Sequence, residues 1–195
     1  MEVRYEKYGF YTIDTEYLKY LYSKDTEVFY SEAKGYERKP YLGLLARLGK
    51  HLYCIPLTSA KQTHLNWKNI TEHNYLIYEN VFESELRDND IFKQIDKTEI
   101  YKKLLAVLEI KKMIPVDETL CKFIKFTEVT DKDYLSLLQK EYRFLIPHKD
   151  SILDKAKTMY LKQKETGKVK YCYCSFSLLE DAYESYSNPS NKESD

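Results

Sequence analysis

The chain has 195 residues, a length that suits one domain with a substantial core and is short for two. Its content of 43% hydrophobic and 32% charged residues is typical of a globular protein, and no apolar run is long enough to span a bilayer. Thirty-one basic and 31 acidic residues cancel, so the total charge gives no support for nucleic-acid binding.

The N-terminal residues MEVRYEKYGF are charged and aromatic, without the apolar core of a signal peptide, so we expect a cytoplasmic location. Four cysteines fit a reducing compartment as free thiols, and Cys172 and Cys174 are too close in sequence to favour pairing with each other. No CxxC or Cys/His spacing suggests zinc. We therefore predict neither a structural metal nor a cofactor.

The first predicted elements are a strand and a helix. The run GFYTI, Gly9–Ile13, is aromatic and β-branched, which predicts a strand. Asp14 is an N-cap candidate for a helix over TEYLKYLYSK. Helical spacing places four apolar side chains on one face of it: Tyr17, Leu18, Leu21 and Tyr22. A polar connection, residues 26–39, follows.

The next segment predicts a β-hairpin. PYLGLLARL and HLYCIPL are strand-like arms around Leu48, Gly49 and Lys50. Gly43 inside the first arm indicates a bulge or a close backbone approach. After this hairpin, residues 74–79 (NYLIYE) predict another strand.

The second half of the chain predicts mainly helices. Residues 83–103 are charged and predicted to be helical or irregular, while the apolar run 104–116 fits either a helix or a strand and ends near Pro115. The remaining predicted elements are amphipathic helices over 131–146 and 150–165 separated by Pro147 and His148, a stop at Gly167, a last strand over 169–177, a short helix over 178–186 and a disordered tail, 187–195. Strands followed by helices predict an α+β fold in one domain, residues 1–186, with a small curved antiparallel sheet that carries the helices.

The charge distribution is more informative than the total. Residues 34–68 contain one acid, Glu37, and seven basic residues: Lys34, Arg38, Lys39, Arg47, Lys50, Lys61 and Lys68. Residues 149–170 are also rich in lysine. These lysines either form a solvated helix face or contact RNA phosphates. Twenty tyrosines offer stacking faces for bases, although we favour a packing role for most of them.

The stretch CIPLTSAKQTHLNWK, residues 54–68, places hydroxyl and lysine side chains, which could take part in catalysis, at the end of a predicted strand. An antiparallel hairpin that turns at Gly49 places Pro40 near Leu57, so Lys39 and Thr58 should be neighbours. Two hydroxyls, Thr58 and Ser59, then converge with two lysines, Lys39 and Lys61. Loops held at strand ends are common places for functional sites.

This set of groups limits the chemistry. A carboxylate pair and a glycine-rich phosphate loop are both lacking. An acyl hydrolase would use Ser59 and Lys61, but no GxSxG motif or oxyanion-hole turn accompanies them. RNA cleavage by the substrate's own 2′-hydroxyl fits better, since it needs only proton transfer and cationic stabilisation of the phosphorane. A non-catalytic RNA-binding module remains an alternative.

At these residues the chain resembles the ToxN/AbiQ family of type III toxin–antitoxin endoribonucleases. The resemblance extends from about Phe10 to Tyr186 and is carried, in chain order, by GFYTI, PYLGLL, YCIPLTSAKQTH, KKMIPV and CSFSLLEDAYESY. It implies an SH3-like (MazF/Kid-like) small antiparallel barrel elaborated with helices, and it makes 104–116 a strand. Residues 83–103 look like an insertion.

The resemblance also implies an activity. Similar proteins cleave single-stranded, often A-rich RNA without a metal ion and leave 2′,3′-cyclic phosphate and 5′-hydroxyl ends. A repeat RNA pseudoknot holds them inactive in protein–RNA assemblies, some of them closed rings, and several act in phage defence by abortive infection.

Carried onto this chain, the resemblance puts Lys61 in the central catalytic position and lets Thr58 and Ser59 bind the scissile phosphate or the 2′-oxygen. Lys39 matches a basic residue before the first hairpin strand. Tyr36 is the nearest counterpart of a loop tyrosine, because the matching position itself holds Gly35.

A second set of residues is predicted to bind RNA: Lys34, Arg38, His64, Trp67 and Lys68. For His64 a structural hydrogen bond and an RNA contact or general acid are equally balanced. Trp67 either stacks on a base or covers the sheet. Without the resemblance, Thr58 and Ser59 would be interpreted as a turn or helix cap, and Lys61 as a solvated lysine.

Overall fold

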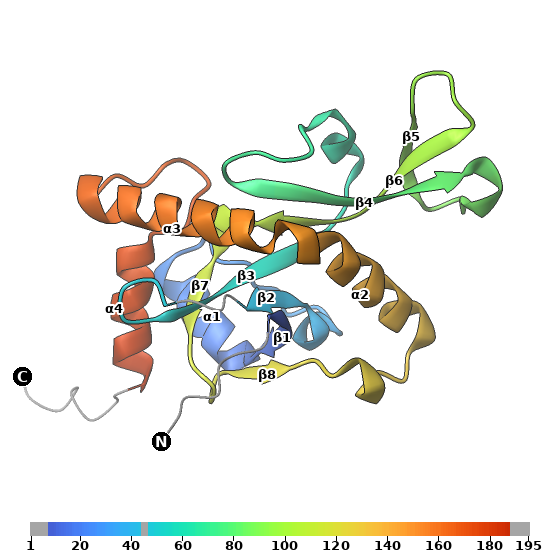
Figure 1. Ribbon diagram of the computed structural model, residues 1–195. Coiled ribbons are helices and arrows are strands. Elements are labelled where there is room, and N and C mark those ends of the chain that lie inside the picture. Colours follow the sequence, from blue (N-terminus) through green and yellow to red (C-terminus); the bar gives the residue numbers. More distant parts are fainter. Residues whose placement is uncertain (1–7, 44–46, 188–195) are drawn as a thin grey trace, which may run out of the picture.

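The computed structural model describes residues 8–43 and 47–187. These form an α+β fold in which strands and short 3-10 helices come first and long helices follow (Figure 1). The strands are β1 Gly9–Ile13, β2 Tyr41–Gly43, β3 Leu52–Ser59, β4 Asn74–Phe82, β5 Ile91–Gln94, β6 Ile100–Glu109, β7 Ile114–Val116 and β8 Cys121–Phe123. The α-helices are α1 Thr15–Lys24, α2 Lys132–Leu145, α3 Lys149–Thr166 and α4 Phe176–Ser187, and the 3-10 helices are η1 Tyr36–Arg38, η2 Gln62–Asn66, η3 Glu83–Glu85, η4 Ile110–Lys112, η5 Phe126–Glu128 and η6 Ile146–His148.

The N-terminal strand and helix are confirmed. The Asp14 side chain caps α1 by accepting a hydrogen bond from the Tyr17 amide at 2.8 Å. Tyr17, Leu18 and Leu21 are buried as predicted, and the Tyr17 hydroxyl donates to the Pro115 carbonyl at 2.8 Å. Tyr22, assigned to the same helical face, is 39% exposed.

The predicted hairpin is confirmed in the described residues of its two arms. Leu48 and His51 exchange backbone hydrogen bonds around Gly49, whose φ of +61° suits glycine in a tight turn. Gly43 marks a close approach, because a Cβ there would lie 2.5 Å from the Tyr11 ring. Gly43 thus leaves room for an aromatic ring of β1, the strand that pairs with β2, whereas the sequence predicted a bulge or a close backbone approach.

The strands form one antiparallel eight-stranded sheet in the order β4-β6-β3-β2-β1-β8, with β5 paired to β6 and β7 paired to β3. Strand β3 belongs to both halves, because its first residues pair with β2 and β7 and its last three pair with β6. Within residues 8–43 and 47–187 no pairing joins β8 to β4, so the described sheet is open.

Residues 83–103 are neither helical nor irregular as a whole, so that prediction is wrong. They contain β5 and the start of β6, a hairpin that projects from the body in Figure 1. Charged side chains are compatible with strands here because both faces meet water, and Lys103 pairs across the hairpin with Asp90 at 2.8 Å. The run 104–116 is mainly β-structure, interrupted by η4 between β6 and β7.

The two long helices are confirmed. Asp131 caps α2 through the Tyr134 amide at 3.0 Å, η6 carries Pro147 between α2 and α3, and Gly167 ends α3 with a φ of +62°. Helix α4 confirms the short C-terminal helix. The predicted tail lies outside the described residues except for Ser187, the last residue of α4.

The last predicted strand, 169–177, is wrong. Its residues form a loop and the start of α4, and Cys172 has a φ of +62°. The Gln163 side chain holds this loop, because its amide nitrogen donates to the Cys174 carbonyl at 3.0 Å and its oxygen accepts from the Phe176 amide at 2.6 Å. A side chain from α3 thus satisfies backbone groups that a strand neighbour would otherwise pair.

The core explains most of the tyrosine excess. Four tyrosines are fully buried: Tyr17, Tyr41, Tyr53 and Tyr75. The Tyr53 and Tyr160 hydroxyls both donate to Glu180 at 2.9 Å, which satisfies their polar ends inside the core. All four cysteines are free, and no cluster of His, Cys, Asp or Glu in the described chain suits a metal ion. No described helix is both long and apolar enough to cross a membrane.

Candidate active site

A cavity of about 410 Å³ opens where η1, the ends of β2 and β3, β6 and α2 meet. Four of the predicted catalytic residues line it: Tyr36, Lys39, Thr58 and Ser59. Its remaining walls come from Gly35, Arg38, Pro40, Leu57, Leu105, Ala106, Tyr134, Leu137 and Glu141.

The hairpin register brings Lys39 and Thr58 together. Tyr41 pairs with Pro56, and the Leu57 amide donates to the Pro40 carbonyl at 3.1 Å. The residues just outside this pair are Lys39 and Thr58, which confirms the geometric prediction. Ser59 is the last residue of β3 and faces β6 at Ala106.

Lys39 has an altered environment. Burial lowers the pKa of its ammonium group to about 8, Glu109 opposes this shift, and the positive charge of Lys61 adds to it. The Lys39 Nζ lies 4.9 Å from the Phe29 ring centroid and 5.5 Å from that of Tyr36. Lys61 therefore lies within electrostatic reach of Lys39, although it does not itself line the cavity.

The polar groups of this cluster are free to bind a ligand. Among the described residues, neither the Thr58 nor the Ser59 hydroxyl has a hydrogen-bond partner, and neither lysine forms an ion pair. Two cations without ion-pair partners and two hydroxyls without hydrogen-bond partners among the described residues suit an anion with several oxygens, such as a phosphodiester. A hydrogen bond between Ser59 and Lys61, as an acyl hydrolase would use, is not present in this part of the chain.

His64 holds the loop after β3. The Lys61 amide donates to His64 Nδ1 at 3.0 Å, and the His64 amide donates back to the Lys61 carbonyl at 2.9 Å. Neutral His64 therefore carries its proton on Nε2. Burial is the main cause that lowers the pKa of His64, so the ring stays neutral near pH 7 and positions Lys61. This favours the structural alternative for His64.

The other predicted residues differ in burial, and of the four described next only Tyr36 lines the cavity. Trp67 packs against His64 with ring centroids 4.5 Å apart and is 39% exposed. Burial raises the pKa of Tyr36 to about 12, so its hydroxyl stays protonated. Lys34 and Lys68 are exposed and do not line the cavity.

Arg38 is tied to helix α2. Its guanidinium lies 5.8 Å from the Tyr134 ring centroid and 3.8 Å from Asp131, and the Tyr134 hydroxyl donates to the Arg38 carbonyl at 2.6 Å. These contacts dock η1 onto α2 and form one wall of the cavity.

The sequence interpretation missed two buried acids at the site. Glu109 ends β6, is 5% exposed, pairs with Lys111 at 3.4 Å, and acts electrostatically on both Lys39 and His64. Glu141 lines the cavity from α2 and is 3% exposed. The signal for Glu141 was present, since it follows Leu138 by three residues and precedes Leu145 by four on the buried helix face.

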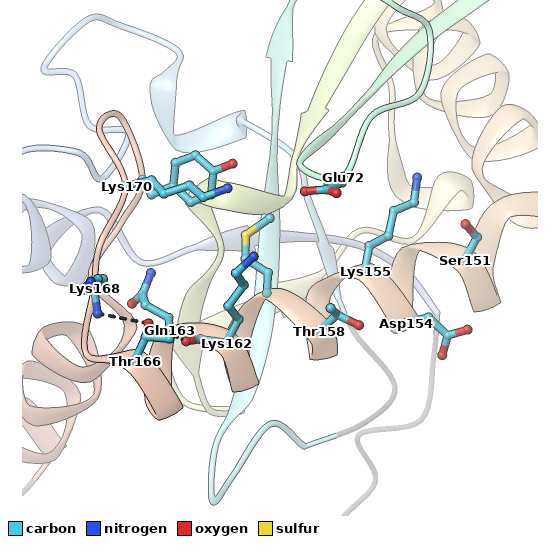
Figure 2. Close-up of a pocket in the computed structure, with 12 residues that line it drawn as sticks. Glu72, Ser151, Asp154, Lys155, Thr158, Lys162, Gln163, Thr166, Lys168 and Lys170 are labelled. Carbon is cyan, nitrogen blue, oxygen red and sulfur yellow. Dashed lines mark hydrogen bonds between the residues drawn. The ribbon is translucent and has the colours of Figure 1, made fainter.

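A second and larger cavity, of about 650 Å³, lies along α3 (Figure 2). Lys155 and Lys162 reach it from the helix, Lys168 and Lys170 from the following loop, and Glu72 from the opposite side. The Lys155 Nζ donates to the Thr71 carbonyl at 2.8 Å. None of the residues predicted to be catalytic lines this cavity, so we place the chemistry in the smaller one.

Comparisons with known proteins identify relatives of the whole chain. A family model described as toxin ToxN, type III toxin–antitoxin system, matches residues 9–184. The endoribonuclease ToxN of Bacillus thuringiensis subsp. kurstaki is 31% identical over 91% of this chain and 83% of its own length, and that of Pectobacterium atrosepticum is 29% identical over 91% and 92%.

Solved structures with similar folds also match most of this chain. One, from work on a processed non-coding RNA that regulates a bacterial antiviral system, has a TM-score of 0.68 at 28% identity and covers 91% of this chain and 98% of its own. A second, from work on selective toxin inhibition by a non-coding RNA pseudoknot, has a TM-score of 0.66 at 29% identity over 91% and 96%. The lactococcal anti-phage endoribonuclease AbiQ shares the fold with a TM-score of 0.65 at 22% identity over 92% and 98%. The chain belongs to the ToxN family of type III toxin–antitoxin toxins.

Proposed function

We propose that the cavity beside the hairpin is the active site of this ToxN-family endoribonuclease, and that it cleaves single-stranded RNA by attack of a ribose 2′-hydroxyl on the adjacent phosphate. One observation carries the proposal. Lys39, Thr58 and Ser59 line one cavity with Lys61 in electrostatic reach, and none of their polar side-chain groups is hydrogen-bonded or ion-paired to another described residue.

The environment of Lys39 supports a proton-transfer role. With a pKa of about 8, roughly a tenth of Lys39 is neutral at pH 7 and can accept the 2′-hydroxyl proton. The exposed, charged Lys61 then stabilises the phosphorane, and Thr58 and Ser59 donate hydrogen bonds to its oxygens. The bond to the 5′-oxygen breaks, which leaves a 2′,3′-cyclic phosphate and, after protonation, a 5′-hydroxyl.

A direct test incubates the protein with RNA in the presence of EDTA and examines the new ends. We expect fragments that polynucleotide kinase labels without prior phosphatase treatment, because their 5′ ends carry hydroxyls. A strand with a single 2′-deoxynucleotide at the cut should stay intact, since it lacks the nucleophile. Cleavage of that strand, or cleavage only with added Mg²⁺, would contradict this mechanism.

One variant and two measurements on the wild-type protein separate the alternatives. Lys61→Ala should lose growth inhibition and cleavage while its melting temperature stays unchanged, because the side chain is exposed. If the wild-type protein binds RNA in a salt-sensitive manner without producing new ends, a non-catalytic RNA-binding module is the correct alternative. Labelling of Ser59 by an acyl or phosphonate probe would instead support an acyl hydrolase.

The expected partner is a repeat RNA pseudoknot. The solved relatives include a toxin inhibited by such an RNA and a bacterial antiviral system regulated by a non-coding RNA. We propose that an RNA of this kind inhibits the present toxin in the cytoplasm and that the pair acts in phage defence by abortive infection. Lysines at the α3 cavity without acidic partners in the described chain, Lys162, Lys168 and Lys170, are suitable contacts for its phosphates.

We infer that β1, β2, β3, β7 and β8 form the SH3-like unit, because β3 pairs with β2 and β7 along its first part and with β6 at its end, and so bends from one half of the sheet into the other. Such a shared strand is how a small antiparallel sheet curves toward a barrel.

A further inference from the structure

Glu141 is an acid in an unusual position. It lies on the buried face of α2 between Leu138 and Leu145, and its residue is 3% exposed. Its Oε2 is buried and has no hydrogen-bond partner among the residues that the structure describes. A buried polar atom without a partner destabilises a fold, which makes this carboxyl group a candidate for pairing with a ligand.

The side chain faces the cavity of the proposed active site. Glu141 lines it from α2, whereas Thr58 and Ser59 line it from β3. Between these polar walls the surface is largely apolar, with Leu57, Leu105, Ala106, Leu137 and the Tyr134 ring. The volume of about 410 Å³ admits a planar base next to a phosphate. Base-binding sites combine apolar or aromatic walls with a few polar groups at the base edge.

Glu141 is neutral near pH 7. Burial raises the pKa of its carboxyl group to about 8. The titratable or charged groups that face it across the cavity are Tyr134 on its own helix and Tyr36, Arg38 and Lys39 from η1 and the residue after it. Arg38 is engaged with Asp131, and burial is the only cause that acts on the Glu141 pKa. A neutral carboxyl group offers one donor and one acceptor side by side.

We propose that Glu141 is a base-binding residue of this site: its carboxyl group hydrogen-bonds the edge of one RNA base, in the nucleotide whose phosphate lies at Thr58 and Ser59. The ligand class is a nucleobase edge with a donor next to an acceptor, such as N6–H and N1 of adenine or N4–H and N3 of cytosine. An ionised carboxylate would present acceptors only and would match adjacent N–H donors instead, as on guanine. The inference rests on the proposed function for the position of the RNA.

Two substitutions of similar size test this role. Glu141→Gln keeps a donor and an acceptor without ionising, and Glu141→Met keeps the length of the side chain and removes both. A structural role for the acid predicts that both variants bind RNA normally, and general acid catalysis predicts that Glu141→Gln loses cleavage. Because Met leaves no buried oxygen unsatisfied, we expect its melting temperature to equal or exceed that of the wild type, which also verifies folding.

The binding measurement uses four short strands of equal length: 2′-O-methyl oligoadenylate, oligocytidylate and oligouridylate, and an abasic strand. Binding of each strand is measured by fluorescence anisotropy at pH 7. The 2′-O-methyl group blocks cleavage, so binding is measured whether or not the protein is a nuclease. We expect Glu141→Gln to bind within about twofold of wild type, and Glu141→Met to bind the best strand roughly tenfold more weakly and approach the affinity for the abasic strand.

The pH dependence gives a second readout. Between pH 7 and 9 the wild type should lose its preference for the base-containing strand as Glu141 ionises, whereas Glu141→Gln should keep it. Titration of Lys39 occurs in both proteins and therefore does not produce this difference. The inference is overturned if Glu141→Met binds all strands like the wild type, or if Glu141→Gln is as weak as Glu141→Met. RNA that is bound with this pattern but never cleaved would refute the proposed function and leave the base contact intact.

Discussion

The sharpest prediction concerns Lys39→Arg. Arginine keeps the positive charge near the phosphate but stays protonated at any accessible pH, so it cannot accept a proton. At pH 7 a lysine with a pKa of about 8 is neutral in about one molecule in ten, compared with about one in 3,000 for the ordinary value of 10.5. The environment of Lys39 thus raises the population of proton acceptor by roughly 300-fold.

The expected loss follows from the role of a general base, which contributes roughly 10²- to 10⁴-fold to a rate. We expect Lys39→Arg to reduce the single-turnover rate of RNA cleavage within this range, with the dissociation constant for 2′-O-methyl RNA changed by less than about fivefold, because the charge remains. The wild-type rate should rise about tenfold per pH unit below pH 8 and level off above it, as Lys39 loses its proton. The variant should be slow and lack this rise.

Single-turnover cleavage of an end-labelled RNA from pH 6 to pH 9 measures both effects. Lys50→Arg is a matched control, since Lys50 is an exposed lysine in the hairpin turn that does not line the cavity. A Lys39→Arg protein that cleaves within a few fold of wild type, with the same pH profile, would show that the proton acceptor is another group.

Three further predictions concern the packing of β2, the loop that holds Lys61, and the cavity along α3. Gly43→Ala should lower the free energy of unfolding by about 1–3 kcal/mol in urea, because its Cβ would lie 2.5 Å from the Tyr11 ring; equal stability would contradict the close approach. His64→Ala should slow cleavage about tenfold with little change in melting temperature, since one loop hydrogen bond, to the Lys61 amide, is worth about 1 kcal/mol. An unchanged rate would mean that the histidine does not position the lysine. Lys162→Ala should reduce the salt dependence of binding to the inhibitory RNA by about one counterion, whereas Lys162→Arg should not; identical slopes would remove this lysine from the interface.

Much of the local structure could be predicted from the sequence because short-range physics decides it. The strand Gly9–Ile13, the Asp14 cap, the turn at Gly49 and the stop at Gly167 each depend on side-chain or backbone preferences of neighbouring residues. The hairpin turn also fixes the register, and the register alone was sufficient to predict that Lys39 and Thr58 are neighbours.

The two wrong segments failed for a common reason. Residues 83–103 carry charges that local preference assigns to a helix or loop, yet β5 and the start of β6 pair with each other within this segment, and β6 also pairs with β4. Residues 169–177 have strand-like composition, but the Gln163 side chain from α3 supplies the hydrogen bonds that a neighbouring strand would have made. In both segments tertiary contacts decided the conformation.

The sequence by itself identified the hydroxyls and the lysine of the motif from Cys54 to Lys68 and placed them at a strand end, but not the two buried acids, Glu109 and Glu141. Only the tertiary structure decided the protonation states of these groups and which other residues lie beside them. The shift in the Lys39 pKa and the neutral state of Glu141 arise from desolvation, which depends on how η1, β3, β6 and α2 close around the cavity. Desolvation is a property of packing between segments far apart in the chain, and no local pattern of residues encodes it.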